Sequence, residues 1–329
     1  MVSNPVAEKN ESLTVGIDLG GSKVDISIVA SDGTVITSSK HPTYAHKGPQ
    51  EVIASVIIAI ETLFRETSRK ADIIGVGVAG QIDKESGIVR FSPNLFWHDV
   101  PLQSILEESL HIPVILNNDV RAATWAEWKY GAGRGIDDLV CLFIGTGIGG
   151  GIVSSGQLLE GCNNAAGEIG HATIVAGGRP CRCPNSGCLE AYAGGWAIAQ
   201  RAQEYVMNDP ENGRRLLDLA GDVTQITAAT VTQAYREADP LAGQIVAETA
   251  HYLAAGMTSL VNMLNPCVLI LGGGVIAGLP DYVAKSDAIV RQNALRSAVE
   301  RLQIVTASLG DQAGPIGAAM LARHMVDSG

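Results

Sequence analysis

Residues 14–38 read TVGIDLGGSKVDISIVASDGTVITS, and this stretch decides the fold class. Thr14–Ile17 is predicted to be a strand, and the glycines that follow it form a turn. Val24–Val29 is predicted to be the next strand, because its apolar and polar residues alternate. The Asp-Gly pair at 32–33 is a hairpin signal that leads into a third strand. The chain therefore begins with a strand, a glycine turn and a hairpin.

The same order of elements returns in the second half of the chain. Asp138–Ile144 reads as a strand, and the glycine-rich run Gly145–Gly151 separates it from a strand led by Ile152–Val153. A third glycine turn, Gly272–Gly274, follows the apolar strand Val268–Leu271. Two such hairpins in the two halves of one chain are what a nucleotide cleft between duplicated domains would need. The third turn either lets a nucleoside approach the backbone or simply begins a βα unit.

Length and composition set the broad class. With 329 residues the chain is long enough for two domains. Its 46% hydrophobic residues, 17% charged residues and 38 glycines are typical of an α/β protein with buried strands. The net charge of −11 disfavours nucleic acid and anionic membranes as partners. The polar N-terminus is unlike a secretory signal, and the longest apolar run, Val52–Ile60, is too short to span a bilayer, so we expect a cytoplasmic protein.

The first glycine turn is suited to phosphate and magnesium. Gly20 and Gly21 let the backbone approach a ligand, and successive N–H groups in such a turn can point at phosphate oxygens. Asp18, at the end of the first strand, is placed to hold a magnesium ion or its water shell. The spacing is not that of a P-loop, because a hairpin and not a helix follows the strand. An ordinary hairpin with an aspartate at its strand end is the alternative.

A second carboxylate ends a different strand. Val114–Leu116 is a short apolar run that leads into Asn117, Asn118 and Asp119 before a helix at Val120–Tyr130. Ligands of open α/β sheets bind at the carboxyl ends of strands, so Asp119 is a candidate for chemistry. Asp119 is also a good helix N-cap, and Asn118 could serve the same loop, so capping alone is the alternative.

Residues 167–190, GEIGHATIVAGGRPCRCPNSGCLE, contain a metal-ligand pattern. One imidazole and three thiolates come from His171, Cys181, Cys183 and Cys188. This is the ligand set of a closed tetrahedral zinc site, and a cytoplasmic location disfavours disulfides. We expect a structural zinc that ties the loop so that His171, a buried Glu168 and Glu190 can face one small substrate. For His171, metal ligation alone and a neutral core histidine are the alternatives.

For the other cysteines and segments the sequence predicts structural roles only. The isolated cysteines are expected to be small buried side chains, at Cys141, Cys162 and Cys267. Helices are predicted at Pro49–Arg69, Pro101–Leu110, Ala191–Val206, Thr224–Glu237, Pro240–Leu264 and Gly314–Met325, and further strands at 73–78 and 304–308. Asn212–Gly221 is expected to be a polar connection.

Taken together, these motifs resemble the ROK family (repressors, open reading frames and sugar kinases) over about Thr14–Arg323. IDLGGSK resembles its first phosphate motif, FIGTGIGGGI its second and VLILGGGV its adenosine motif. AAGEIGH followed by CRCPNSGCLE resembles the family signature and its zinc loop, which is the most specific match. Pro184 stands where glycine is usual, but it leaves the ligand spacing intact.

The resemblance implies an α/β fold of two actin-like (ribonuclease H-like) domains with a cleft between them. A small domain would comprise residues 1–121, and the C-terminal helix at about 311–329 would return to it. A large domain with the zinc loop would comprise residues 122–310. The sugar would lie in the cleft, with ATP across it.

The resemblance also implies ATP-dependent phosphorylation of a hexose hydroxyl, with glucose converted to glucose 6-phosphate. ATP, Mg²⁺ and a structural Zn²⁺ are the expected cofactors, and a homodimer is the expected assembly. N-acetylmannosamine, N-acetylglucosamine, fructose, mannose and allose are alternative substrates. A sugar-sensing repressor is disfavoured because the first strand begins near Thr14, which leaves no room for a winged helix-turn-helix. A polyphosphate-using kinase is disfavoured because such relatives generally lack the cysteine loop.

Residue roles follow from the same resemblance. Asp119 is the expected catalytic base, which accepts the proton of the attacking hydroxyl. The sugar is expected to contact Gly80, Asn94, Asn118, Asp119, Glu168, His171 and Glu190. Magnesium and the nucleotide are expected to contact Asp18, Gly20, Gly21, Ser22, Lys23, Gly145, Thr146, Gly147, Gly273 and Gly274.

Overall fold

The computed structural model describes residues 12–328 and divides into two compact units. The first unit runs up to Tyr130 and takes up the chain again from Asp311, and the second comprises Gly131–Gly310. The predicted boundary between residues 121 and 122 falls inside helix α3 (Asp119–Lys129), all of which belongs to the first unit.

The first unit is built on a five-stranded mixed sheet. Its strands, in spatial order, are β3 (Val35–Pro42), β2 (Lys23–Ala30), β1 (Leu13–Leu19), β4 (Ile73–Val78) and β8 (Val114–Asn118). The first three form the predicted antiparallel hairpins, whereas β1, β4 and β8 are parallel. The carboxyl ends of the three parallel strands therefore meet at one edge of the sheet.

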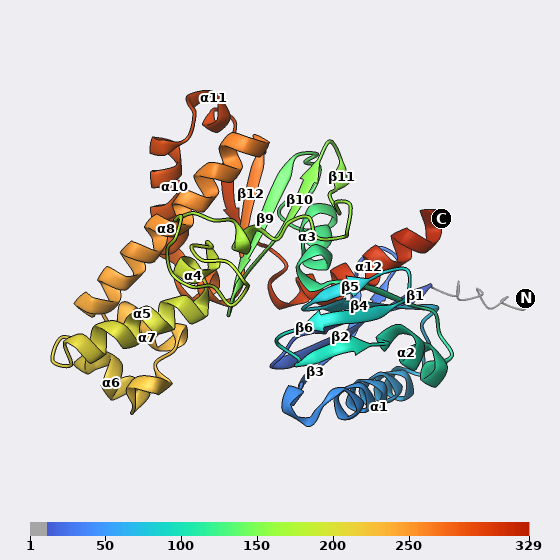
Figure 1. Cartoon of the computed structure of the whole chain (residues 1–329). Coiled ribbons are helices and arrows are strands. Elements are labelled where there is room, and N and C mark those ends of the chain that lie inside the picture. The colour runs from blue at the N-terminus through green and yellow to red at the C-terminus, as the bar shows by residue number, and fades with distance from the viewer. Residues whose placement is uncertain (1–11, 329) are drawn as a thin grey trace, which may run out of the picture. The chain divides into compact units, whose positions relative to one another are not determined.

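Helices cover both faces of this sheet (Figure 1). Helices α1 (Pro49–Thr67) and α2 (Leu102–Leu110) lie on one face, and α3 and α12 (Ala313–Ser328) lie on the other. Glycines allow α12 to approach the sheet closely, because a Cβ at Gly16 or Gly75 would collide with the backbone of that helix. The C-terminal helix is therefore part of the first unit's core.

A small antiparallel sheet in the first unit was not predicted. It consists of β5 (Gln81–Asp83), β6 (Ile88–Ser92) and β7 (Trp97–Val100). Strands of three to five residues are too short to show a clear alternation of apolar and polar residues. The Ser92 hydroxyl donates a hydrogen bond to the carbonyl oxygen of Ala79 (2.6 Å), which fastens this sheet to the end of β4.

The second unit repeats the topology of the first. Its strands, in spatial order, are β11 (Gln157–Leu158), β10 (Ile148–Ser154), β9 (Leu139–Ile144), β12 (Val268–Gly272) and β13 (Gln303–Thr306). Strands β9 and β10 form an antiparallel hairpin, and β9, β12 and β13 are parallel. The duplication predicted from the paired hairpins is present in the strand order.

The long helix α8 (Pro240–Leu264) is central to the core of the second unit. The other helices of this unit are α4 (Glu190–Ala193), α5 (Gly195–Asn208), α6 (Arg214–Ala220), α7 (Ala228–Arg236), α9 (Gly274–Gly278), α10 (Pro280–Asn293) and α11 (Arg296–Val299). Short 3₁₀ turns lie at Ala45–Lys47, Ile169–His171, Val223–Gln225 and Gly310–Gln312. Within residues 12–328 no helix is both long and apolar enough to cross a membrane.

Two predicted segments are wrong. The helix expected at Ala191–Val206 is interrupted at Gly194, which is extended (φ −72°, ψ 157°), because the chain there passes against another loop. Asn212–Gly221 is not a polar connection but contains α6, whose Leu216 is completely buried.

The isolated cysteines also differ from expectation. Cys141 is buried as predicted, but Cys162 and Cys267 are exposed. Both lie in segments that connect elements, outside the strand that buries Cys141.

Candidate active site

The predicted residues of the first unit gather at the carboxyl edge of its parallel strands. Asp18 is near the end of β1 and pairs with Gly77 of β4, and Asp119 directly follows β8. A Cβ at Gly77 would lie 3.2 Å from the Cα of Asp119. Because Gly77 has no side chain, strand β4 places nothing bulky between the two carboxylates at this position. The sheet thus brings together two acids that are 101 positions apart in the sequence.

The Asp18 carboxyl has an unusual environment. Part of the residue reaches solvent, yet its carboxyl is surrounded by protein. Desolvation by burial, followed by the negative charge of Asp119 and then of Asp25, raises the pKa of Asp18 to about 7, and Lys23 opposes this shift. A buried acid beside a second acid is an environment in which a cation is favourable, and the magnesium role of Asp18 stays a prediction.

Helix α3 begins with Asp119, but Asn118 caps it. The Asn118 side-chain oxygen accepts a hydrogen bond from the Arg121 N–H (3.0 Å). The capping alternative considered for Asp119 is therefore wrong, since Asp119 is the first helical residue. Its negative charge at the helix N-terminus is favourable.

Two other predicted sugar contacts lie close to the first glycine turn. Asn94 is exposed in the loop between β6 and β7, and a Cβ at Gly21 would lie 2.5 Å from its carbonyl oxygen. Gly80 packs in the same way against the Phe91 backbone. The small sheet β5–β7 therefore brings Asn94 against the turn, which no local pattern in the sequence indicated.

The rest of the first turn is held by short polar contacts. The Thr43 hydroxyl donates to the Gly20 carbonyl (2.7 Å), and the Thr43 N–H donates to the Ser22 carbonyl (3.1 Å). Lys23 forms ion pairs with Asp25 (3.1 Å) and Asp311 (3.5 Å). Lys23 thus contacts two carboxylates of its own unit as well as flanking the predicted phosphate turn.

The predicted nucleotide residues of the second unit also form one group. Gly145, Thr146 and Gly147 connect β9 to β10, and the Gly145 N–H donates to the Gly147 carbonyl (3.0 Å). Gly273 follows the neighbouring parallel strand, where its backbone packs against the last residue of β9. Gly274 begins α9, so this third turn does start a βα unit.

Glu190 contacts the second turn directly. Its Oε2 accepts a hydrogen bond from the Ile148 N–H (2.8 Å), and its Oε1 accepts one from the indole Nε1–H of Trp196 (3.1 Å). Glu190 is half-buried and is the first residue of α4. A predicted sugar ligand is therefore hydrogen-bonded to the end of the predicted phosphate turn.

The four predicted zinc ligands converge. The ligand atoms of His171, Cys181, Cys183 and Cys188 all lie within 4.8 Å of one another. The Sγ atoms of Cys183 and Cys188 are 3.6 Å apart, which is too long for a disulfide, whereas Zn–S bonds of about 2.3 Å separate two tetrahedral sulfur ligands by roughly 3.8 Å. The spacing fits a closed Cys₃His site.

His171 and Glu168 lie at the exposed edge of this loop. The Nδ1 of His171 is 3.7 Å from Cys181 Sγ, so this nitrogen faces the ligand cluster. The Nε2 is then the nitrogen suited to a sugar hydroxyl. Glu168 is exposed, and the expectation of a buried carboxylate is wrong, because Glu168 precedes a 3₁₀ turn in a surface loop.

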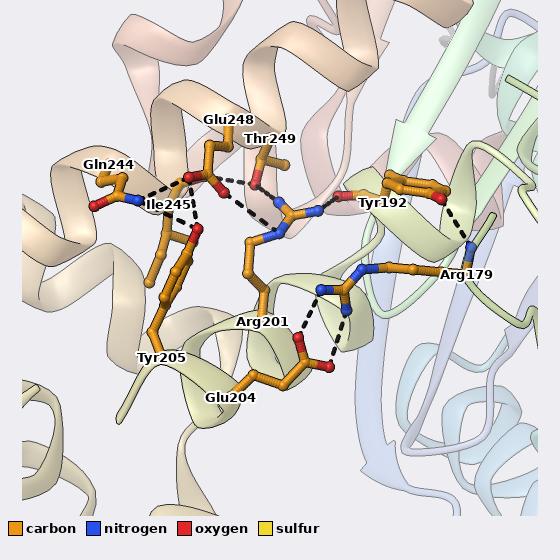
Figure 2. A network of polar contacts seen from close by, with 9 residues as sticks. All are labelled: Arg179, Tyr192, Arg201, Glu204, Tyr205, Gln244, Ile245, Glu248 and Thr249. Atoms are coloured by element: carbon orange, nitrogen blue, oxygen red, sulfur yellow. Dashed lines mark hydrogen bonds and ion pairs between the residues drawn. The ribbon is translucent and has the colours of Figure 1, made fainter. Parts of the chain in front are cut away.

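A network of half-buried and buried polar groups fastens the cysteine loop to α5 and α8 (Figure 2). The Arg179 guanidinium forms a bidentate ion pair with Glu204 (3.0 and 2.6 Å). The backbone N–H of Arg179 donates to the Tyr192 hydroxyl (2.8 Å). Arg201, only 4% exposed, donates to the Tyr192 carbonyl (3.2 Å) and to Thr249 Oγ1 (2.9 Å). Tyr192 thus contacts both arginines two positions after Glu190, and the network restricts where Glu190 can lie.

Comparisons with known proteins agree with this geometry. The sequence model of the ROK family matches residues 14–325. The chain is 32% identical over 324 residues to the glucokinase of Streptomyces coelicolor, which covers 95% of this chain and 98% of that one. The chain belongs to the ROK family.

A solved structure supports the same assignment. A ROK family glucokinase from Streptomyces griseus, in complex with glucose and AMPPNP, matches with a TM-score of 0.83 and 33% identity. The match covers 95% of this chain and 100% of that one, and it confirms the predicted fold of two actin-like domains.

The family also includes regulators. A xylose repressor of Caldicellulosiruptor bescii is 30% identical over 316 residues, which cover 94% of this chain and 77% of the repressor.

Several residues at these sites were missed from the sequence. Asp25, Lys40 and Asp311 form the charged surroundings of the first turn, and Trp196 binds Glu190. Asp311 lies in the segment that returns to the first unit, so its distance in sequence hid it. Trp196 follows Glu190 by six positions, and a single tryptophan at the start of a helix carries no signal by itself.

Proposed function

We propose that the chain is an ATP-dependent hexose kinase that converts glucose to glucose 6-phosphate. The observation that carries the proposal is the pair of equivalent strand–turn–strand hairpins together with Asp119 at the carboxyl edge of the first sheet. Relatives called glucokinases match over 95% of the chain and support glucose among the hexoses.

The chemistry proposed for the first unit centres on Asp119. Its carboxylate accepts the proton of a sugar hydroxyl as the oxygen attacks the γ-phosphorus. Mg²⁺, when bound, offsets the charge of the phosphate oxygens, and Asp18 would hold the ion or its water shell. Asn94, Asn118 and Gly80 would contact neighbouring sugar hydroxyls.

The second unit would bind both ligands through separate groups. Glu168, Glu190 and the Nε2 of His171 would contact hydroxyls of the sugar, and the backbone N–H groups of the Gly145–Gly147 turn would contact phosphate. Zn²⁺ held by the Cys₃His cluster would be structural, because four protein ligands leave no position open for water.

Asp119→Asn is the direct test. The carboxamide keeps the size of the side chain but cannot accept the proton, so the phosphorylation rate should fall by roughly 10²- to 10⁴-fold while sugar binding is largely kept. ADP release would be followed over glucose, N-acetylmannosamine, N-acetylglucosamine, fructose, mannose and allose. The exposed carboxylate of Asp218 provides the control variant Asp218→Asn. If no sugar raises ADP release by the wild-type protein, the kinase proposal fails.

The repressor relatives supply a second candidate. A sugar-responsive DNA-binding protein would show specific retardation of operator DNA in a shift assay, and the net charge of −11 argues against such binding.

A further inference from the structure

Trp196 touches three functional parts of the second unit. Its backbone N–H donates to the Thr146 carbonyl of the glycine turn (2.9 Å), and its indole Nε1–H donates to Glu190 Oε1 (3.1 Å). The guanidinium of Arg182, which lies between two cysteines of the metal cluster, is 4.8 Å from the centre of the indole ring. One residue therefore contacts the turn through its backbone, and the carboxylate and the cysteine loop through its side chain.

The Glu190 carboxylate is shared in a similar way. Oε2 accepts a hydrogen bond from the N–H of Ile148, the residue that follows the turn. Oε1 accepts one from the indole N–H of Trp196. An ionised carboxylate has about four acceptor positions. Each oxygen of Glu190 can therefore accept a sugar hydroxyl as well, and the same group then faces two ligands.

Little room is left for the turn to move by itself. The Gly195 N–H donates to the Gly145 carbonyl (3.0 Å), and a Cβ at Gly147 would collide with Glu190 Oε2. Backbone of the turn thus packs directly on the junction between α4 and α5. A displacement of the Glu190 carboxylate that keeps its hydrogen bond to Ile148 must therefore be accompanied by a displacement of the turn.

We propose that Trp196 is a positioning residue that couples the carboxylate of Glu190 to the Gly145–Gly147 turn, so that sugar and nucleotide raise each other's affinity. The inference rests on the proposed function, because it takes Glu190 as a sugar ligand and the turn as a phosphate ligand. Either ligand orders the carboxylate, the indole and the turn together, and the second ligand then meets a site that is already ordered. Linkage requires the effect to be equal in both directions.

The test is calorimetric binding of AMPPNP with and without saturating glucose, or the hexose that the substrate panel selects. We expect sugar to tighten AMPPNP binding to the wild-type protein on the order of tenfold. Trp196→Phe keeps a ring for Arg182 but lacks the indole N–H. In this variant the ratio of the two dissociation constants should fall below about twofold, with a smaller change in the affinity measured without sugar.

A matched control lies on the same helix. Tyr205→Phe also removes one donor, in this case the hydroxyl that binds Glu248 (2.7 Å), and should keep the full ratio. Thermal unfolding and zinc content would be measured alongside, because a merely structural loss would change these and not the ratio. Glu190→Gln is the second variant if Trp196→Phe is too unstable to purify, and its ratio should also fall.

The outcomes separate the two proposals. A wild-type ratio in folded Trp196→Phe, or in Glu190→Gln, overturns the coupling. A wild-type protein that phosphorylates glucose but binds AMPPNP equally with and without it also overturns the coupling and leaves the kinase proposal intact. A wild-type protein that phosphorylates none of the sugars overturns the kinase proposal itself.

Discussion

The two glycine turns follow equivalent strands of two equivalent sheets, but different kinds of contact surround them. The first turn, Gly20–Ser22, is flanked by Asp18 and Lys23 of its own hairpin, and Lys23 also pairs with Asp311 from a distant segment. The second turn, Gly145–Gly147, has no acid of its own and takes Glu190 from 42 positions beyond Ile148.

This difference affects how each carboxylate is held. The carboxyl of Asp18 is buried beside other acids, and burial and their negative charge together raise its pKa to about 7. Glu190 instead accepts two hydrogen bonds, one from the Ile148 N–H and one from the indole N–H of Trp196. The same topology therefore carries a buried acid with a raised pKa in one unit and a carboxylate fixed by two N–H donors in the other.

Removal of one ligand of the proposed metal site should have the largest effect on activity. Cys188→Ser deletes a completely buried ligand, so we expect loss of zinc, a loosened cysteine loop and a fall in kcat/KM of at least roughly 100-fold as Glu190 loses its support. Zinc content, thermal unfolding and ADP release would be measured together. Cys162→Ser, at an exposed cysteine outside the cluster, is the control. Full activity in zinc-free protein would contradict a supporting role of the metal.

The Asp18 carboxyl should make the stability of the apoprotein depend on pH. Its pKa in the folded state is about 7 against an ordinary 3.8, so between these values the folded state holds a proton that the unfolded state has released. The free energy of unfolding should therefore fall as pH rises from about 4 to 7, by up to about 1.4 kcal/mol per pH unit, and level off above 7. Urea unfolding of wild-type protein and Asp18→Asn would show this slope in the former only. Parallel pH profiles for the two proteins would refute the assignment.

Substitution of alanine for one glycine in each turn tests how the surroundings of the two turns differ. Neither Gly21 nor Gly147 has a positive φ, so crowding and not backbone strain is tested. A Cβ at Gly21 meets the Asn94 backbone, which cannot rotate away, and we expect a loss of about 1–3 kcal/mol in the free energy of unfolding. A Cβ at Gly147 meets the end of the Glu190 side chain, which can move. Gly147→Ala should therefore lose less stability but raise the KM for sugar, and equal effects on both quantities would remove the distinction.

The surface charges of the first turn should have the smallest effect. Lys40 pairs with Asp311 (2.7 Å), but both side chains are at least half exposed, at 50% and 69%. Water and salt screen such pairs, so Lys40→Met should lower Tm by no more than about 2 °C, and added salt should reduce the difference further. Scanning calorimetry at two salt concentrations measures both effects. A larger loss would show that the first turn depends on these charges more than on burial.

Local patterns predicted most of the regular structure correctly. The hairpin of β1 and β2, the buried strand β4 and the long helix α8 each show a clear period or a distinct end. The short strands β5–β7 and the helix α6 were missed because three to seven residues do not establish a period. The break between α4 and α5 was missed because its cause is a contact with the Gly145 backbone 50 positions earlier in the sequence.

The candidate site divides in the same way. A predicted set of zinc ligands at short spacing and candidate acids at strand ends could be recognised from the sequence, since both depend on residue type and local order. The exposure of Glu168, the capping by Asn118 and the pairing of Lys23 with Asp311 could not be derived, because each depends on which distant segment packs there.

By itself the sequence determined the α/β class and the duplicated hairpins, and it predicted the metal-ligand set, because these are carried by residue type, periodicity and spacing. Tertiary structure alone decided that Glu190 accepts hydrogen bonds from both Ile148 and Trp196 beside the second turn. The physical reason is that a hydrogen bond acts over about 3 Å in space, and only the packed chain brings these groups within that distance.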